Sequence, residues 1–321
     1  MTENKKHIKK TSIGGQALIE GIMMRGPKMT AMAVRNPEGE IVLEKWETKT
    51  STKKGVRKIP VIRGVFNFID SMRFGYKCLM RSAEIAGLED TPKETQEPET
   101  QSAEKKESGS FGMTLLMVIS VVLGVALAIG LFVALPSFLY SLLAKWVPIL
   151  SEDNRWLKSA FEGILKVLIL VGYLALVSLM KDIRRTFMYH GGEHKTIFCY
   201  EQGLPLTVEN VRAQRRFHPR CGTSFLILMI LVSILVSMLI PPTIPTVLRV
   251  VIKLCLLPLI MGIGYELIKF AGKYDNLLTR IISAPGVWLQ HLTVLEPDDS
   301  MIECAITAMS EVIPNDESDN W

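Results

Sequence analysis

The stretch FGMTLLMVISVVLGVALAIGLFVAL, residues 111–135, decides the fold class. It has no charged residue, and as a helix it is long enough to cross a hydrocarbon core of about 30 Å, which takes ~20 residues. Three more apolar stretches follow at residues 163–180, 222–240 and 246–268. Buried helices of soluble proteins are rarely this long and uninterrupted. We therefore predict an α-helical membrane protein with four transmembrane helices, the last one kinked at Pro258.

Composition agrees with apolar blocks separated by polar ones. Of the 321 residues 21% are charged, yet the mean hydropathy is positive at +0.26. The net charge of +5 is small and the basic residues flank apolar stretches, so we expect no nucleic-acid binding. Five scattered cysteines, an odd number, disfavour a disulfide framework. The start of the chain has a basic tail and lacks the apolar segment of a secretory signal.

Lysine and arginine are distributed unevenly between the two sides that four spans create. Residues 1–110 carry 20 of them and residues 181–221 carry eight, against three in residues 136–158 and none in residues 240–245. Basic loops normally stay in the cytoplasm. We therefore predict a multi-pass protein of the cell (plasma) membrane with both termini cytoplasmic. Its expected partner is the lipid bilayer, and no substrate or protein partner is indicated.

The polar and apolar blocks divide the chain into six segments. They are a cytoplasmic N-terminal segment (1–86), a disordered linker (87–110), a first transmembrane hairpin (111–180), a cytoplasmic His/Cys loop (181–221), a second transmembrane hairpin (222–268) and cytoplasmic C-terminal helices (269–321). The cytoplasmic segments together form a small α+β portion.

Two of these segments have a readable local pattern. Residues 29–48 alternate around a turn and predict a β-hairpin. Residues 60–86 have helical spacing with interspersed basic residues, typical of an amphipathic helix that lies on a membrane surface or packs on the hairpin. In the C-terminal segment, helical spacing is broken at Pro285, and a last helix starts near Ser300.

The His/Cys loop carries the residues that indicate chemistry. His190 and His194 are four apart with Glu193 between them, an inverted form of the zincin motif, in which two histidines bind zinc and the glutamate is the general base. If the segment is helical, both imidazoles lie on one face. Zinc then needs a third protein ligand, and water takes the fourth position. The candidates for the third ligand are His218, Cys221, Glu20 and Glu266.

The residues alone leave several alternatives open in this loop. Gly191 and Gly192 cost a helix about 1 kcal/mol each, so a loop fits as well as a helix. The histidines and cysteine are also compatible with a closed structural metal site, or with no metal at all. Lys195 and Arg220 are candidates for holding an anionic substrate group or a carboxylate.

Acidic residues outside the loop also have two interpretations. Glu20 is either a site carboxylate or the partner of Arg25 in a buried ion pair. Glu266 lies at the inner end of the fourth span, where it can face the His/Cys loop. Asp298 and Asp299 resemble metal ligands, but the dipole of a helix favours acidic residues at its start without any metal.

Four motifs carry a resemblance to a known family. They are GGQALIEG with MMRG (residues 14–21 and 23–26), HGGEHKT (190–196), HPRCGTS (218–224) and EPDD (296–299). In this order, over nearly the whole chain apart from residues 87–110, the sequence resembles the YqhQ-like family of bacterial membrane proteins of unknown function. The resemblance implies a membrane location and the same choice of motifs. The family is sometimes labelled a predicted metal-dependent enzyme.

The sequence therefore predicts one site at the inner membrane surface. The glycine-rich segment 13–27, the His/Cys loop and the acidic turn at 296–299 are expected to converge there. The leading hypothesis is a hydrolase that uses a divalent metal, zinc first, with Glu193 as general base. Its ligands are His190 and His194, completed by His218 or Cys221. The alternatives are a non-enzymatic scaffold or partner-binding protein and, with less support, a transporter, which needs polar groups deep in its spans.

Overall fold

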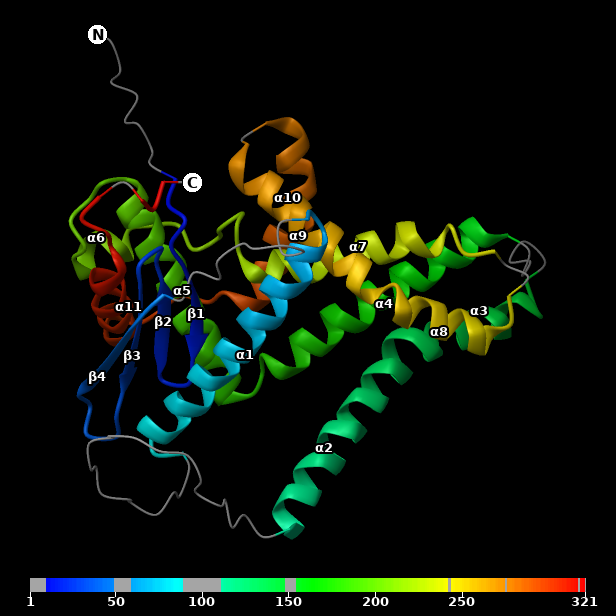
Figure 1. The fold of residues 1–321 in the computed structure, drawn as a ribbon, viewed down its shortest axis with the longest axis horizontal. Helices are drawn as coiled ribbons and strands as arrows, with labels where there is room; N and C mark the ends of the chain where they lie inside the picture. Colours follow the sequence, from blue (N-terminus) through cyan, green and yellow to red (C-terminus); the bar gives the residue numbers. More distant parts are fainter. Residues whose placement is uncertain are drawn as a thin grey trace. The chain divides into compact units, whose positions relative to one another are not determined.

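The structure, a computed structural model, describes residues 10–48, 59–88, 111–147, 154–241, 244–274, 276–316 and 318–320. Figure 1 shows the order of the elements along the chain. Contacts within the chain divide it into two units. The first consists of Met1–Asp90, Leu170–Ser233 and Leu256–Trp321, and the second of Thr91–Ile169 and Ile234–Cys255. Most of the predicted linker, residues 89–110, lies outside the described residues.

A four-stranded antiparallel sheet organises the first unit. Its strands are β1 (Gly14–Leu18), β2 (Gly21–Arg25), β3 (Met29–Arg35) and β4 (Ile41–Glu47), in the order β1-β2-β3-β4. The predicted hairpin at 29–48 is β3–β4. The glycine-rich segment forms a further hairpin, β1–β2, which the sequence pattern does not predict. The reason is that β2 is buried on both faces, so the alternation that marks a half-buried strand is absent.

Helices cover both faces of this sheet. On one face, Met24 packs against α5 (Lys181–Glu201) and α11 (Asp299–Val312). On the other face, Met32 packs against α1 (Ile62–Ile85). The amphipathic segment 60–86 therefore packs on the sheet, which is one of the two arrangements its pattern allowed.

The predicted His/Cys loop is largely helical, which decides between the helix and the loop that its sequence left open. α5 continues through both glycines, and α6 (Val208–Arg212) follows. Tertiary packing outweighs the propensity cost, because a Cβ at Gly191 would meet the carbonyl oxygen of Leu295. A correction concerns α10 (Leu277–Thr293), which runs through Pro285, where the sequence predicts a break.

Two apolar helices are long enough to cross a membrane within the described residues. α2 (Phe111–Ile129), the π-helical turn η2 (Gly130–Ala134) and α3 (Leu135–Ala144) follow one another, and Ile119–Ala144 forms a 26-residue apolar helix. α4 (Arg155–Val177) contains the second, the 22 residues Trp156–Val177. Both exceed the ~20 residues that a bilayer requires.

The remaining apolar stretches are broken or short. α8 (Thr246–Cys255) and α9 (Leu257–Lys273) are bent at a break beside Pro258, which confirms the predicted kink. If this bent pair counts as one span, the described residues contain three helices that could cross a membrane. α7 (Gly222–Ser237) has 16 residues. By length and composition, the structure thus supports two or three of the four predicted spans.

Candidate metal centre

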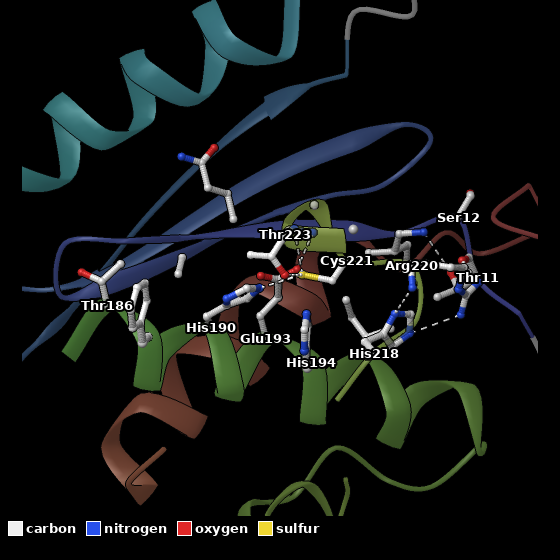
Figure 2. A pocket seen from close by; sticks show the side chains of 18 residues that line it. Thr11, Ser12, Thr186, His190, Glu193, His194, His218, Arg220, Cys221 and Thr223 are labelled. Atoms are coloured by element: carbon white, nitrogen blue, oxygen red, sulfur yellow. Dashed lines mark hydrogen bonds between the residues drawn. The ribbon is translucent and has the colours of Figure 1, made fainter. Parts of the chain in front are cut away.

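α5 presents three of the predicted site residues together. His190, Glu193 and His194 have the i, i+3, i+4 spacing of one helix face. Figure 2 shows their side chains directed from α5 into a cavity of about 410 Å³. Residues 11–17, which include the first four residues of β1, line the same cavity. His194 is 2% exposed and Glu193 is 6% exposed, so the protein shields both from bulk water.

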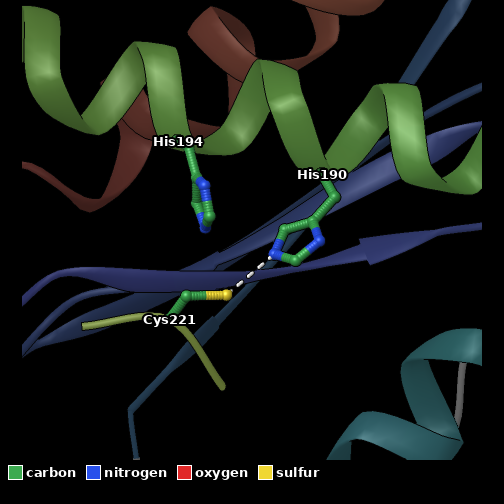
Figure 3. Close-up of side chains that lie close together, drawn as sticks. All are labelled: His190, His194 and Cys221. Carbon is green, nitrogen blue, oxygen red and sulfur yellow. Dashed lines mark hydrogen bonds between the residues drawn. The ribbon is translucent and has the colours of Figure 1, made fainter. Parts of the chain in front are cut away.

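Cys221 adds a thiol from another part of the chain. It immediately precedes α7, and its Sγ lies 3.1 Å from His190 Nε2 (Figure 3). One ligand atom from each of His190, His194 and Cys221 lies within 4.8 Å of the other two. Tetrahedral zinc with its usual bond lengths separates such atoms by roughly 3.3–3.6 Å, so small side-chain adjustments are sufficient. The described residues therefore contain a three-ligand group of the kind that zinc takes.

Backbone carbonyls orient both imidazoles. His190 Nδ1 lies 2.9 Å from the carbonyl oxygen of Thr293, and His194 Nδ1 lies 2.5 Å from that of Arg216. A carbonyl only accepts, so each Nδ1 carries the proton, and each Nε2 keeps its lone pair. This outer hydrogen bond is the usual partner of a metal-binding histidine, since it fixes the tautomer and the ring orientation.

Glu193 lies beside this group as a separate carboxyl. Its Oε1 accepts a hydrogen bond of 3.0 Å from the Gly15 N–H. Burial raises the pKa of Glu193, while His190 and the Gly15 amide act in the opposite direction. A carboxyl with a raised pKa suits a group that takes up and releases a proton in a catalytic cycle.

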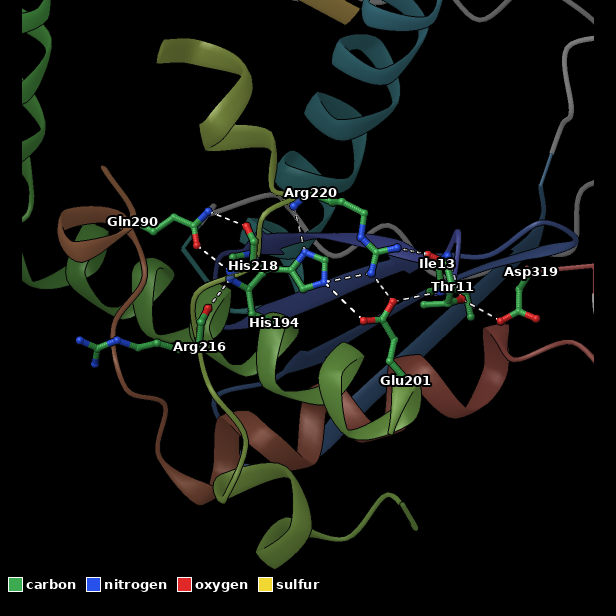
Figure 4. A network of polar contacts seen from close by, with 9 residues as sticks. All are labelled: Thr11, Ile13, His194, Glu201, Arg216, His218, Arg220, Gln290 and Asp319. Carbon is green, nitrogen blue, oxygen red and sulfur yellow. Dashed lines mark hydrogen bonds and ion pairs between the residues drawn. The ribbon is translucent and has the colours of Figure 1, made fainter. Parts of the chain in front are cut away.

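His218, a predicted ligand, belongs to a neighbouring polar network (Figure 4). Its Nδ1 accepts a 3.2 Å hydrogen bond from the Arg220 N–H, and its Nε2 lies 3.4 Å from Arg220 Nη2 and 3.8 Å from Glu201 Oε2. Burial lowers the pKa of His218 to about 4, although the hydrogen bond with Glu201 opposes this. The ring centroids of His218 and His194 are 5.5 Å apart. The geometry thus favours Cys221 as third ligand, with His218 packed beside the site.

The same network ties the two ends of the described chain to the site. Glu201 pairs with Arg220 and accepts a 3.0 Å hydrogen bond from the Thr11 N–H, while Thr11 Oγ1 donates to Asp319 at 2.7 Å. Burial by itself raises the pKa of Glu201, but His218 and Arg220 together bring it below its ordinary value. Because Arg220 is already paired, it is a poor candidate for holding a substrate anion.

Lys195, the other predicted anion-binding residue, is also used inside the protein. It is buried in α5, donates to the carbonyl oxygen of Arg212 at 2.9 Å and pairs with Glu296 at 2.7 Å. These contacts join α5 to the acidic turn that precedes α11. Lys195 therefore holds the layers together and does not line the cavity that contains the histidines.

Glu20 and Glu266 are not near the ligand group, and the predicted ion pair of Glu20 with Arg25 is wrong. Glu20 lies in the β1–β2 turn and pairs with Arg185 at 2.5 Å. Glu266 on α9 pairs with Arg63 on α1. Arg25 lines a second cavity, of about 340 Å³.

Asp298 and Asp299 begin α11, as the helix-dipole interpretation predicted. Asp298 is the N-cap, and its Oδ1 accepts from the Met301 N–H at 2.9 Å. Asp299 pairs with Arg212 on α6. Neither belongs to the ligand group.

Several groups that shape the site are not identified from the sequence. The carbonyls of Thr293 and Arg216 and the amide of Gly15 leave no trace in it, because every residue has the same backbone groups. Glu201 does have a signal, since it lies seven residues after His194 on the same helical face. A buried carboxylate at that spacing indicates a polar network next to the histidines.

Comparison with known proteins places this site in a family. The family model described as "Protein of unknown function (DUF1385)" matches residues 59–315. The chain is 38% identical over 310 residues to the "Uncharacterized protein YqhQ" of Bacillus subtilis (strain 168), over 96% of this chain and 94% of that one. No solved structure matches. The predicted YqhQ-like resemblance is thereby confirmed, and the chain belongs to the DUF1385 family, whose function is unknown.

Proposed function

We propose that this protein is a metal-dependent hydrolase at a membrane surface, with a divalent ion held by His190, His194 and Cys221. The observation that carries the proposal is the approach of these three ligand atoms to within 4.8 Å of one another. They border a cavity of about 410 Å³, within the size range of small-molecule sites.

The donor set favours zinc. Two imidazoles and one thiolate suit zinc, whereas magnesium and calcium prefer oxygen ligands. Three protein ligands leave the fourth position open, as in catalytic zinc sites, whereas structural sites close it with a fourth side chain. Zinc bound there would supply the Lewis acidity that activates a water molecule at neutral pH.

Glu193 is the proposed general base. The Gly15 amide holds Oε1, and among the described residues Oε2 accepts no hydrogen bond. That second oxygen is therefore available to receive a proton from a water molecule in the cavity. Burial, which raises the pKa of this carboxyl, favours its taking up that proton.

The test compares wild type with Glu193→Gln after loading with zinc. We expect both to hold about one equivalent of zinc. Of a panel of p-nitrophenyl esters and phosphodiesters, at least one should be hydrolysed by wild type and roughly 100-fold more slowly by the variant. Equal hydrolysis would contradict the role of Glu193. Loss of zinc from Glu193→Gln would make Glu193 a fourth ligand and the site structural.

For the membrane arrangement, we infer four spans with both termini cytoplasmic. The sheet, α5 and α11 pack into one unit, so the chain must return to the same side at α5 and again at α11. The chain therefore crosses the membrane an even number of times between the sheet and α5, and again between α5 and α11. Ile119–Ala144 and α4 form the first pair. If α8–α9 is one span, α7 must be its partner, although its 16 residues extend only about 24 Å.

The distribution of basic residues gives this arrangement its direction. Residues 1–110 and 181–221, which would share the side of the sheet, carry 20 and eight lysine and arginine residues, against three in residues 136–158 and none in 240–245. Such segments normally remain in the cytoplasm. The metal group would then face the cytoplasm, next to the inner membrane surface.

A further inference from the structure

The second unit contains a buried cluster of charges that the metal site does not explain. α4 contributes Glu162 and Lys166, one helical turn apart, and α8 contributes Arg249 and Lys253 at the same spacing. All four are at least nine-tenths buried, with Glu162 2%, Arg249 4%, Lys166 6% and Lys253 9% exposed. Charged side chains in such apolar helices are costly unless they are paired, so their presence indicates a function.

Both oxygens of the one carboxylate in this cluster have a partner. Glu162 forms an ion pair with Lys253, and its other oxygen accepts a 2.8 Å hydrogen bond from Ser137 on α3. In the part of this unit that the structure describes, Glu162 is the single acidic residue. Lys166 and Arg249 therefore have no carboxylate of their own there.

The remaining cations have hydrogen-bonding capacity to spare. Lys166 makes no hydrogen bond or ion pair with any described residue, although it lies in the field of both Glu162 and Lys253. Arg249 donates from Nη2 to the carbonyl oxygen of Pro241 at 2.8 Å, but its buried Nε–H has no acceptor. A buried donor without an acceptor and a buried ammonium without a counter-ion both cost stability.

We propose that Lys166, Arg249 and Lys253 bind a phosphate group between α4 and α8. A phosphate offers several acceptor oxygens and a negative charge, which together meet the excess of donors and of positive charge. Exposed apolar side chains lie on both helices, among them Ile164 and Leu168 on α4 and Val251 on α8. A lipid headgroup could therefore dock with its acyl chains against these faces, and free phosphate is the other source of the same chemistry.

The experiment uses the full-length protein, purified in neutral detergent and stripped of lipid. Thermal unfolding is followed with dioleoylphosphatidylglycerol, dioleoylphosphatidylcholine or inorganic phosphate added. At an anion concentration about 100 times its Kd, binding should raise Tm by roughly 5 °C. A rise with phosphatidylglycerol alone identifies a lipid, and an equal rise with inorganic phosphate identifies a free-anion site.

Matched variants locate the effect. Lys166→Met and Arg249→Gln should each remove at least half of the Tm rise, whereas Lys166→Arg and Lys145→Met, the latter at an exposed lysine of the same unit, should keep it. Native mass spectrometry of wild type purified without the lipid-stripping step should show one retained phospholipid or phosphate, and this needs no variant. The proposal is overturned if no additive changes Tm and no anion is retained, or if the rise survives in both Lys166→Met and Arg249→Gln.

This inference is independent of the metal site. Its residues belong to the second unit, whereas the His/Cys group belongs to the first. The test of metal content and the test of anion binding can therefore give positive or negative results independently of each other.

Discussion

At the scale of single residues, Gly191 and Gly192 are adjacent but differ in what surrounds them. A Cβ at Gly191 would meet the Leu295 carbonyl oxygen, whereas a Cβ at Gly192 would have its nearest neighbours at 3.6 Å, an ordinary contact. We expect Gly191→Ala to destabilise by about 1–3 kcal/mol despite the better helix propensity of alanine. Gly192→Ala should be neutral or stabilising. Thermal unfolding of the two variants checks this, and equal Tm values would contradict the packing seen at Gly191.

A second prediction concerns buried thiols. Burial raises the pKa of Cys304 to about 11 from 9.0, against the opposing charge of Arg35. Between these values the unfolded chain ionises this thiol while the folded protein keeps it protonated. Stability should therefore fall as pH rises from 9 to 11, by up to about 1.4 kcal/mol per pH unit. Cys304→Ala should show a shallower fall in Tm over this range, and parallel curves would refute the assignment.

The sequence predicted the ligand residues better than their surroundings. His190, Glu193 and His194 are identified by helical spacing, and Cys221 by its ligand chemistry. The sequence did not decide between Cys221 and His218 as third ligand, because that choice depends on how the chain after α6 returns to α5. Glu20 and Glu266 lie outside the ligand group and pair with Arg185 and Arg63, distant partners that cannot be read from local sequence.

At the scale of secondary-structure elements, α11 owes its start to Asp298. The side chain accepts from the Met301 N–H, as an N-cap does. Asp298→Ala should cost about 1 kcal/mol and lower Tm, while metal content stays at the wild-type level. Asp298→Ser, which retains a capping oxygen, is the matched control. Loss of metal in Asp298→Ala would return this residue to the list of ligands.

Elements were predictable where one face is polar and not where both are buried. β3–β4 has a turn and an alternating partner strand, so it was found. In β1–β2, β2 is buried on both faces, so no alternation marks it. α5 was left undecided because helix propensity counts glycine as a cost and contains no term for the close approach of another backbone.

At the scale of the whole molecule, apolar length indicates which helices can cross a membrane and does not settle how many do. Length supports Ile119–Ala144 and Trp156–Val177 directly. α7 is short and α8–α9 is broken beside Pro258. These two therefore count as the second pair of spans only because the chain must cross the membrane an even number of times. Pro258 marks the bend between α8 and α9, but the apolar composition does not show that α7 ends after 16 residues.

The proposed topology makes a labelling prediction. In a Cys255→Ser background, which removes the exposed cysteine, single cysteines are placed at exposed Glu38, Asn154 and Ser310. A membrane-impermeant maleimide added to wall-stripped cells should label Asn154→Cys at once. Glu38→Cys and Ser310→Cys should react only after lysis, because both lie on the cytoplasmic side with the sheet and α11. Labelling of Glu38→Cys and Ser310→Cys from opposite sides would contradict four spans.

The metal content of the purified protein tests whether His190, His194 and Cys221 hold a metal ion. Wild type, His190→Ala, Cys221→Ser and, as a control, His291→Ala at an exposed histidine would be purified without chelator and analysed by plasma mass spectrometry. We expect about one equivalent of zinc in wild type and His291→Ala, and at least tenfold less in the two ligand variants. A folded wild type without stoichiometric metal would show that the protein has no such metal site. A Cys221→Ser protein with the wild-type amount of metal would show that Cys221 is not a ligand.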